Sequence, residues 1–108
     1  MLSLAHYALR QIRIPKEFYL KIKNHCRMQH KKMFVFYEEV ITWFLAQYAA
    51  SPPAYYYASF KNGHCLSLWL KEDKIQKLQQ MAKIAQVSDA RVIATALILY
   101  LEKNGIFL

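Results

Sequence analysis

Hydrophobic and polar residues follow one pattern in the first half of the chain and repeat it in the second. Residues 10–15 alternate between polar and apolar side chains, which predicts a strand, and residues 65–70 place three leucines on one face of a second strand. Each strand is followed by two segments whose apolar residues recur three and four positions apart, which is typical of helices. The pattern predicts the order strand, helix, helix, linker, strand, helix, helix.

Capping signals set the boundaries of the four expected helices. Pro15 stands where the first helix starts, and the second covers about residues 36–49, until two prolines stop it. Acidic residues within 71–73 open the third helix, where the helix dipole favours them. Ser88 is expected to cap the fourth helix, over about residues 89–103, by accepting hydrogen bonds from its free amides.

The two halves align with a nearly constant offset. Ile12 in the first expected strand matches Leu68, 56 residues later, and Val40 in the second helix matches Val92, 52 residues later. The first copy therefore carries about four extra residues between its helices, around residues 30–33.

One strand followed by two helices cannot bury its own apolar faces, whereas two copies can. We therefore expect one domain over residues 1–108, with repeats at 9–50 and 65–104 joined by an aromatic linker at 51–64. The fold class is mainly α with one two-stranded antiparallel β-ribbon, in a single intertwined domain. The helices would enclose the inner ribbon face, made of Ile12, Ile14, Leu66, Leu68 and Leu70. The outer face would stay bare, with Leu9, Gln11, Arg13, Cys65, Ser67 and Trp69.

Composition supports a small packed domain with an anionic partner. Apolar residues make up 56% of the 108 residues and charged residues 20%, and only two glycines and three prolines supply turns, which argues against a sandwich or barrel. The net charge is +8, and eight Lys and Arg residues fall within residues 10–32 with only Glu17 opposing them. Such a field suits nucleic acid or an anionic surface.

The candidate chemistry for other functions is sparse. No clustered Ser/His/Asp arrangement, phosphate loop or carboxylate pair is present, so we expect neither an enzyme nor a cofactor. The spacing of Cys26, Cys65 and the histidines matches no zinc template, and two cysteines suit a reduced cytoplasmic protein. The apolar stretch at 33–50 is interrupted by two glutamates, and residues 1–6 have no signal-peptide pattern, so no membrane insertion is expected.

The expected ribbon has the shape and side chains of a DNA-reading element. A two-stranded ribbon fits the major groove of B-DNA, where Arg pairs with guanine and Gln with adenine through two hydrogen bonds. Gln11 and Arg13 share the outer face and are the candidate base contacts. The candidate phosphate contacts are Lys16, Lys31, Lys32 and Arg91, together with Arg10, which breaks the alternation; solvated surface is the alternative for each.

Two segments resemble a known family. Residues 10–17, Arg-Gln-Ile-Arg-Ile-Pro-Lys-Glu, resemble the opening of ribbon-helix-helix DNA-binding proteins, and residues 87–93, Val-Ser-Asp-Ala-Arg-Val-Ile, resemble their second helix. Two copies in one chain are similar to the TraY-type relaxosome accessory proteins of conjugative plasmids, single-chain pseudo-dimers that bind near the transfer origin and assist the relaxase. The resemblance implies base contacts by Gln11, Arg13, Ser67 and Trp69 and phosphate binding at Ser88, Asp89 and Ala90.

The chain departs from that family pattern in two places. The second strand offers no basic reader, and its Trp69 is suited equally to a thymine methyl or sugar, to a protein partner, or to the core. The first copy has Phe36-Tyr37-Glu38-Glu39 where small capping residues belong. The linker tyrosines at 55–57 either stack on unpaired bases or pack over the helices.

The expected function is sequence-selective binding of double-stranded DNA, as a plasmid relaxosome accessory factor or a transcriptional regulator. The alternative is a protein-interaction module on the same scaffold, docking a relaxase, a coupling protein or another partner through the ribbon or the linker. The chain would act as a monomeric pseudo-dimer that can bind DNA side by side with another copy.

Overall fold

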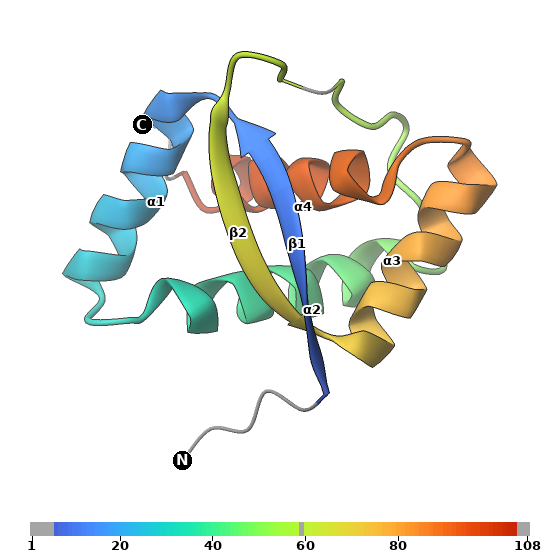
Figure 1. The fold of residues 1–108 in the computed structure, drawn as a ribbon, viewed down its shortest axis with the longest axis horizontal. Coiled ribbons are helices and arrows are strands. Elements are labelled where there is room, and N and C mark those ends of the chain that lie inside the picture. Colours follow the sequence, from blue (N-terminus) through green and yellow to red (C-terminus); the bar gives the residue numbers. More distant parts are fainter. Residues whose placement is uncertain (1–5, 59, 106–108) are drawn as a thin grey trace.

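A two-stranded ribbon lies across the front of four helices in the computed structural model, which describes residues 6–58 and 60–105 (Figure 1). Within those residues the chain is mainly helical with one two-stranded antiparallel sheet, as the sequence predicts. The elements are β1 (Tyr7–Ile14), α1 (Lys16–Met28), α2 (Met33–Tyr48), β2 (His64–Lys71), α3 (Glu72–Ala85) and α4 (Asp89–Lys103).

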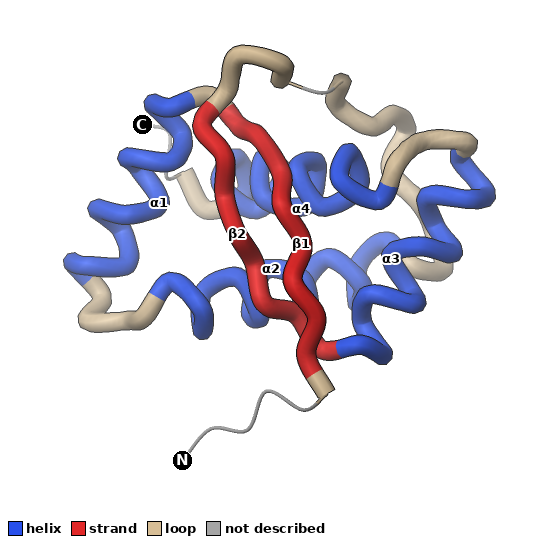
Figure 2. The backbone as a smooth tube through the Cα atoms, in the orientation of Figure 1, coloured by secondary structure: helices blue, strands red, loops and turns tan. Residues whose placement is uncertain are grey.

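The two strands pair along their whole length (Figure 2). The antiparallel register places Tyr7 opposite Lys71 and Gln11 opposite Ser67. The strand β1 begins at Tyr7, three residues before the predicted start, because residues 7–9 are apolar without alternation and hide the period of two. Successive side chains of a strand point to opposite faces, so the register fixes which residues share each side of the ribbon.

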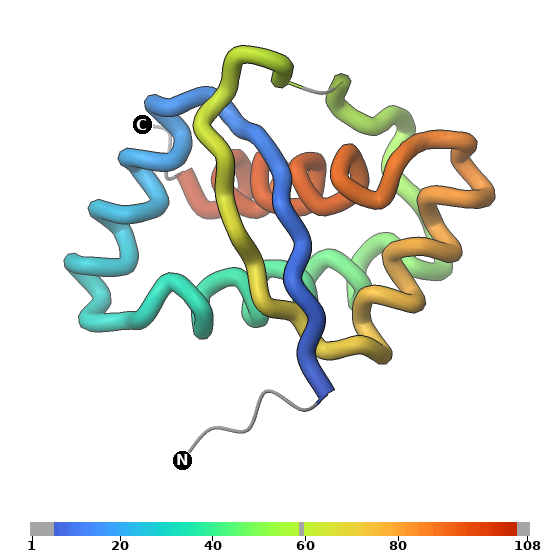
Figure 3. Tube along the Cα trace, viewed as in Figure 1, coloured from blue at the N-terminus to red at the C-terminus, as the bar shows by residue number. Residues whose placement is uncertain are grey.

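The inner face of the ribbon forms the centre of the core. Its five predicted core residues are all buried: Ile12, Ile14, Leu66, Leu68 and Leu70. Behind them α4 packs against β1 and α2 against β2, and these two helices contact each other while running in opposite directions (Figure 3). Every residue of α4 from 92 to 98 is buried. Removing this apolar surface from water is the main favourable contribution to folding.

The helix α2 begins at Met33, earlier than the predicted residue 36. The 52-residue offset places the counterpart of Asp89, the first residue of α4, at Tyr37, four residues after the observed start. Four residues make about one helical turn, so the extra segment of the first half extends the helix. The added turn is held by Phe34, whose ring centroid lies 5.5 Å from that of Tyr7.

The linker is fixed to α4 by a polar clamp. The buried Thr95 accepts a hydrogen bond from the backbone N–H of Tyr57 at 2.9 Å. The Arg91 guanidinium donates from Nε to the Tyr57 carbonyl at 3.0 Å and from Nη2 to the Tyr56 carbonyl at 3.1 Å. Tyr56 packs against the core, whereas Tyr55 is 65% exposed. The contacts of Tyr56 and Tyr57 favour the packing hypothesis for this segment.

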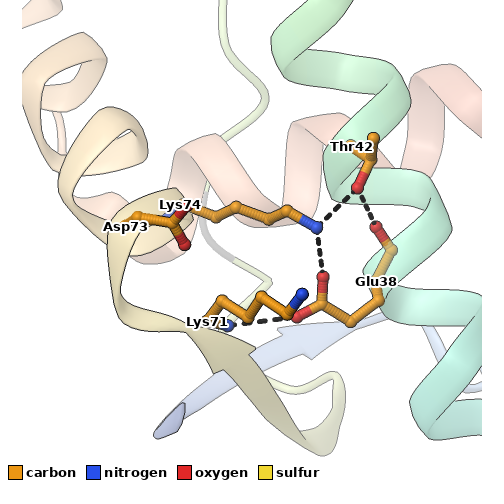
Figure 4. A network of polar contacts seen from close by, with 5 residues as sticks. All are labelled: Glu38, Thr42, Lys71, Asp73 and Lys74. Carbon is orange, nitrogen blue, oxygen red and sulfur yellow. Dashed lines mark hydrogen bonds and ion pairs between the residues drawn. The ribbon is translucent and has the colours of Figure 1, made fainter. Parts of the chain in front are cut away.

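A carboxylate from the first half secures the start of α3 (Figure 4). Glu38 Oε1 accepts a hydrogen bond from the Lys71 backbone N–H at 3.1 Å, and Glu38 Oε2 pairs with Lys74 Nζ at 2.5 Å. Thr42 Oγ1 accepts a further hydrogen bond from Lys74 Nζ at 2.6 Å. Negative charge is favourable at a helix N-terminus, so Glu38 supplies the cap that the side chain of Lys71 does not.

Gly63 is the closest approach between the linker and β1. A Cβ atom at this position would lie 2.6 Å from the Ile14 carbonyl oxygen and 2.9 Å from its carbon. Both are backbone atoms, so the strands would have to separate. We expect Gly63→Ala to lower the free energy of unfolding by about 1–3 kcal/mol, the usual cost of overpacking. Urea denaturation measures this, with the exposed neighbour variant Asn62→Ala as the control; equal stability of the two variants would contradict the close contact.

Candidate nucleic-acid interface

The outer face of the ribbon is uncovered along a strip of six neighbouring side chains, and the exposed Lys71 continues the same face beyond Trp69. Three cross-strand pairs form the strip: Leu9 with Trp69, Gln11 with Ser67, and Arg13 with Cys65. All six are exposed, as the alternation predicts, and no helix of the described residues lies in front of them (Figure 1). Because the opposite face is buried, the helices behind the ribbon support it, and the strip lies over the packed core.

Arg13 and Gln11 carry the hydrogen-bonding capacity of β1 on this strip. Arg13 Nη1 donates to the Gly63 carbonyl at 3.0 Å, which ties the side chain to the turn that precedes β2. A guanidinium has five N–H donors, so one such bond orients the group and still allows contact with a base edge. The amide of Gln11, at the middle of the ribbon, offers both a donor and an acceptor.

Arg10 occupies the inward-facing register of β1, at the border of the core. Its Nε donates to Asp89 Oδ2 at 3.2 Å, and its Nη1 donates to the Leu9 carbonyl at 2.9 Å. Both side chains of the ion pair are about one-third exposed. The pair joins β1 to the start of α4 and partly neutralises both charges. Phosphate contact by Arg10 stays a prediction, and it requires that this pair open or be shared. Phosphate contact at Asp89 also stays a prediction, and it would use the backbone amide at the start of α4.

The N-terminus of α4 has the capping geometry that the sequence predicts. Ser88 Oγ accepts a hydrogen bond from the Arg91 backbone N–H at 3.2 Å, which confirms Ser88 as the N-cap. Ser88 is exposed and Ala90 half-buried, and the first amides of a helix form a favourable environment for a phosphate. The Arg91 guanidinium donates hydrogen bonds to the linker carbonyls of Tyr56 and Tyr57, and its contact with phosphate stays a prediction.

The three predicted lysines lie at the start of α1 and directly before α2. Lys31 Nζ pairs with Glu39 Oε2 at 2.7 Å, and this hydrogen bond raises the pKa of Lys31. Lys32, the N-cap residue of α2, and Lys16, the first residue of α1, are exposed. Lys16 and Lys32 are therefore the lysines best placed to meet an anion without first leaving an ion pair described in the structure.

Aromatic residues that the sequence pattern does not identify lie beside the ribbon. A cavity of about 270 Å³ borders Trp69, and Tyr19 and His64 stack there with ring centroids 4.0 Å apart. Phe34 separates it from a second hollow of about 490 Å³, which Trp43 also lines. The sequence carries one signal for these residues, the apolar run Met33-Phe34-Val35 directly after two lysines. Because the second helix is predicted to start at residue 36, this run is assigned to a loop.

Two buried titratable side chains in the core have a raised pKa. Burial raises the pKa of Tyr37 and the pKa of the Cys26 thiol, so both groups are neutral at physiological pH. Among residues 6–58 and 60–105, no three His, Cys, Asp or Glu side chains gather to hold a metal ion. In the same residues no single helix has the length and apolar content to cross a membrane, although α3 and α4 together pass that test as a pair bent by 104°.

Comparison with known proteins finds no matching family model, no matching curated protein and no matching solved structure.

Proposed function

We propose that this chain binds double-stranded DNA selectively by placing its β-ribbon in the major groove. The observation that carries the proposal is the uncovered outer strip, on which Gln11, Ser67 and Arg13 stand exposed above a fully packed core. The major groove, about 12 Å wide, admits a two-stranded ribbon, and each base pair presents a distinct hydrogen-bonding pattern there. The net charge of +8 adds an attraction to DNA that does not depend on sequence.

The scaffold for this function is a tandem pair of ribbon-helix-helix repeats. The register supports it, because Gln11 lies opposite Ser67, the residue 56 positions later that the sequence offset makes its counterpart. Two strands related by a two-fold axis cross at equivalent residues, so this pairing is the one that a pseudo-dimer requires. The opposite directions of α2 and α4 behind the ribbon fit the same relation (Figure 3). A relaxosome accessory role and a regulatory role both begin with this binding.

We expect Arg13→Ala to weaken binding to the preferred DNA site by about 1–3 kcal/mol, the value of a paired hydrogen bond between Arg and guanine. Selection of bound sequences from a random duplex pool identifies the site, and fluorescence anisotropy measures the affinity. The control is Lys77→Ala, which removes one positive charge from an exposed position of α3 outside the ribbon. Equal losses for the two variants would mean that Arg13 contributes charge alone.

The second candidate function is docking of a protein partner. The observation that favours it is the apolar end of the outer strip, where Leu9 and Trp69 are 39% and 40% exposed beside the aromatic cavity. Exposed tryptophans are enriched among the residues that dominate protein interfaces. Under this alternative, DNA affinity is weak and changes little with salt, and Trp69→Ala abolishes capture of the partner.

A further inference from the structure

The two ends of the outer strip differ in chemistry. At one end Leu9 lies opposite Trp69, and both side chains are about two-fifths exposed. At the other end Arg13 lies opposite Cys65 and donates a hydrogen bond to the Gly63 carbonyl. Gln11 and Ser67 form the polar pair between the two ends. The three pairs therefore run from apolar at Leu9 and Trp69 to cationic at Arg13, and the exposed Lys71 follows Trp69 on the same face.

A two-fold relation between the strands would make the two ends alike. The 56-residue offset makes Leu9 the counterpart of Cys65, and Arg13 the counterpart of Trp69. A dimer of identical strands would therefore repeat the same pair at each end and match a palindromic site. In this chain each end of the strip presents a pair that the other end lacks. The strands therefore pair as two-fold related strands would, but the side chains on the outer strip are not two-fold symmetric.

The neighbouring elements reinforce the same difference. The apolar end is flanked by the added turn of α2, where Phe34 packs near Tyr7 and lines both hollows beside the ribbon. The cationic end is followed by Pro15 and the exposed Lys16. The C5-methyl group of thymine is the apolar group that bases expose in the major groove, and guanine presents two acceptors to an arginine.

We propose that the chain reads a directional, non-palindromic DNA site, with thymine methyl groups at the Leu9–Trp69 end and guanine at the Arg13 end. This inference rests on the proposed binding of double-stranded DNA. It assigns Trp69 to base recognition through the methyl group, and it fixes the orientation of the chain on its site. Gln11 and Ser67 then face the central base pairs.

The test starts from the sequence that the full chain selects from a random duplex pool. Each thymine is replaced in turn by uracil, which removes only the C5-methyl group, and each guanine by 7-deazaguanine, which removes the N7 acceptor. We expect uracil to weaken binding roughly three- to fivefold per methyl at one end of the site, the effect of one buried methyl-sized group. At the opposite end, 7-deazaguanine is expected to weaken it by a similar factor.

Variants connect each end of the DNA to its residue. In Trp69→Ala the uracil substitutions should lose their effect, whereas the 7-deazaguanine effect should persist; Arg13→Ala should give the reverse. The control is Tyr55→Ala, which removes an exposed aromatic ring from the linker and should change neither effect. Circular dichroism of each variant shows whether it is folded.

Two results would overturn the inference while leaving the proposed function intact. One is a selected site that is palindromic, and the other is a loss of methyl dependence that is the same in Trp69→Ala and Tyr55→Ala. A Trp69→Ala variant with normal DNA affinity and lost partner capture would likewise overturn it in favour of protein docking. Failure to select any preferred duplex contradicts the proposed function itself, which separates the two conclusions.

Discussion

Replacing Phe36 with alanine is expected to lower the free energy of unfolding by about 3–5 kcal/mol. Phe36 has no exposed surface, and its ring meets Tyr100 of α4 edge-on with centroids 5.5 Å apart. It also contacts His25 of α1, at a centroid distance of 5.6 Å. One side chain thus joins three helices, and its removal leaves a cavity that the ribbon and helices cannot close without moving.

Urea denaturation measures this loss of stability. The loss is to be compared with the total free energy of unfolding of a domain of this size. A typical folded domain is stable by about 5–15 kcal/mol, so the variant would keep only part of its stability. The control is Val35→Ala, one residue earlier on α2, where the side chain is 40% exposed and the expected change is within about 0.5 kcal/mol. A loss below about 1 kcal/mol for Phe36→Ala would contradict its central packing.

Raising the salt concentration from about 50 to 200 mM is expected to weaken DNA binding about a hundredfold, if about four phosphates are contacted. The logarithm of the affinity should fall linearly with the logarithm of the salt concentration, because each neutralised phosphate releases counterions. The exposed Lys16 and Lys32 and the amides at the start of α4 are the groups that we expect to supply these contacts. Anisotropy titrations of one duplex at several salt concentrations give the slope.

Single variants show how much each residue contributes to this salt dependence. Lys16→Ala and Lys32→Ala should each reduce it by about one and weaken all duplexes alike, as the loss of a phosphate contact does. Lys77→Ala, on the exposed surface of α3, should leave it unchanged. A flat salt dependence in the unaltered protein would argue against phosphate contacts and favour the protein-docking alternative.

Local periodicity predicted most of the secondary structure because strands and helices that bury one face repeat their apolar residues with fixed periods. The alternation around Ile12 and the three leucines of β2 indicated which ribbon face is buried, and the Ser88 signal located the start of α4. The start of α2 was predicted three residues late. Met33 packs against the core and Phe34 against Tyr7 of β1, and these distant contacts leave no period in the sequence.

The sequence predicted which side chains of the candidate site are exposed, but not their hydrogen bonds and ion pairs. Alternation alone placed Gln11 and Arg13 on the exposed strip. Arg10 bonds to Asp89, 79 residues away, and Arg91 bonds to Tyr57, 34 residues away. No local sequence pattern predicts hydrogen bonds over such separations. For the same reason a lysine bound to a carboxylate, such as Lys31, cannot be told from a free one by composition.

Both strands of the ribbon belong to one chain, and this changes how the protein assembles and evolves. The pairing of β1 with β2 is an intramolecular event, so the folded fraction need not depend on the meeting of two subunits. A mutation in either strand alters one side of the outer strip only, whereas in a homodimer it would alter both sides. The hydrogen bonds from Arg91 to the carbonyls of Tyr56 and Tyr57 hold the linker against α4. A substitution on the outer face of one strand can therefore change one side of the strip while the buried face of the ribbon keeps its packing.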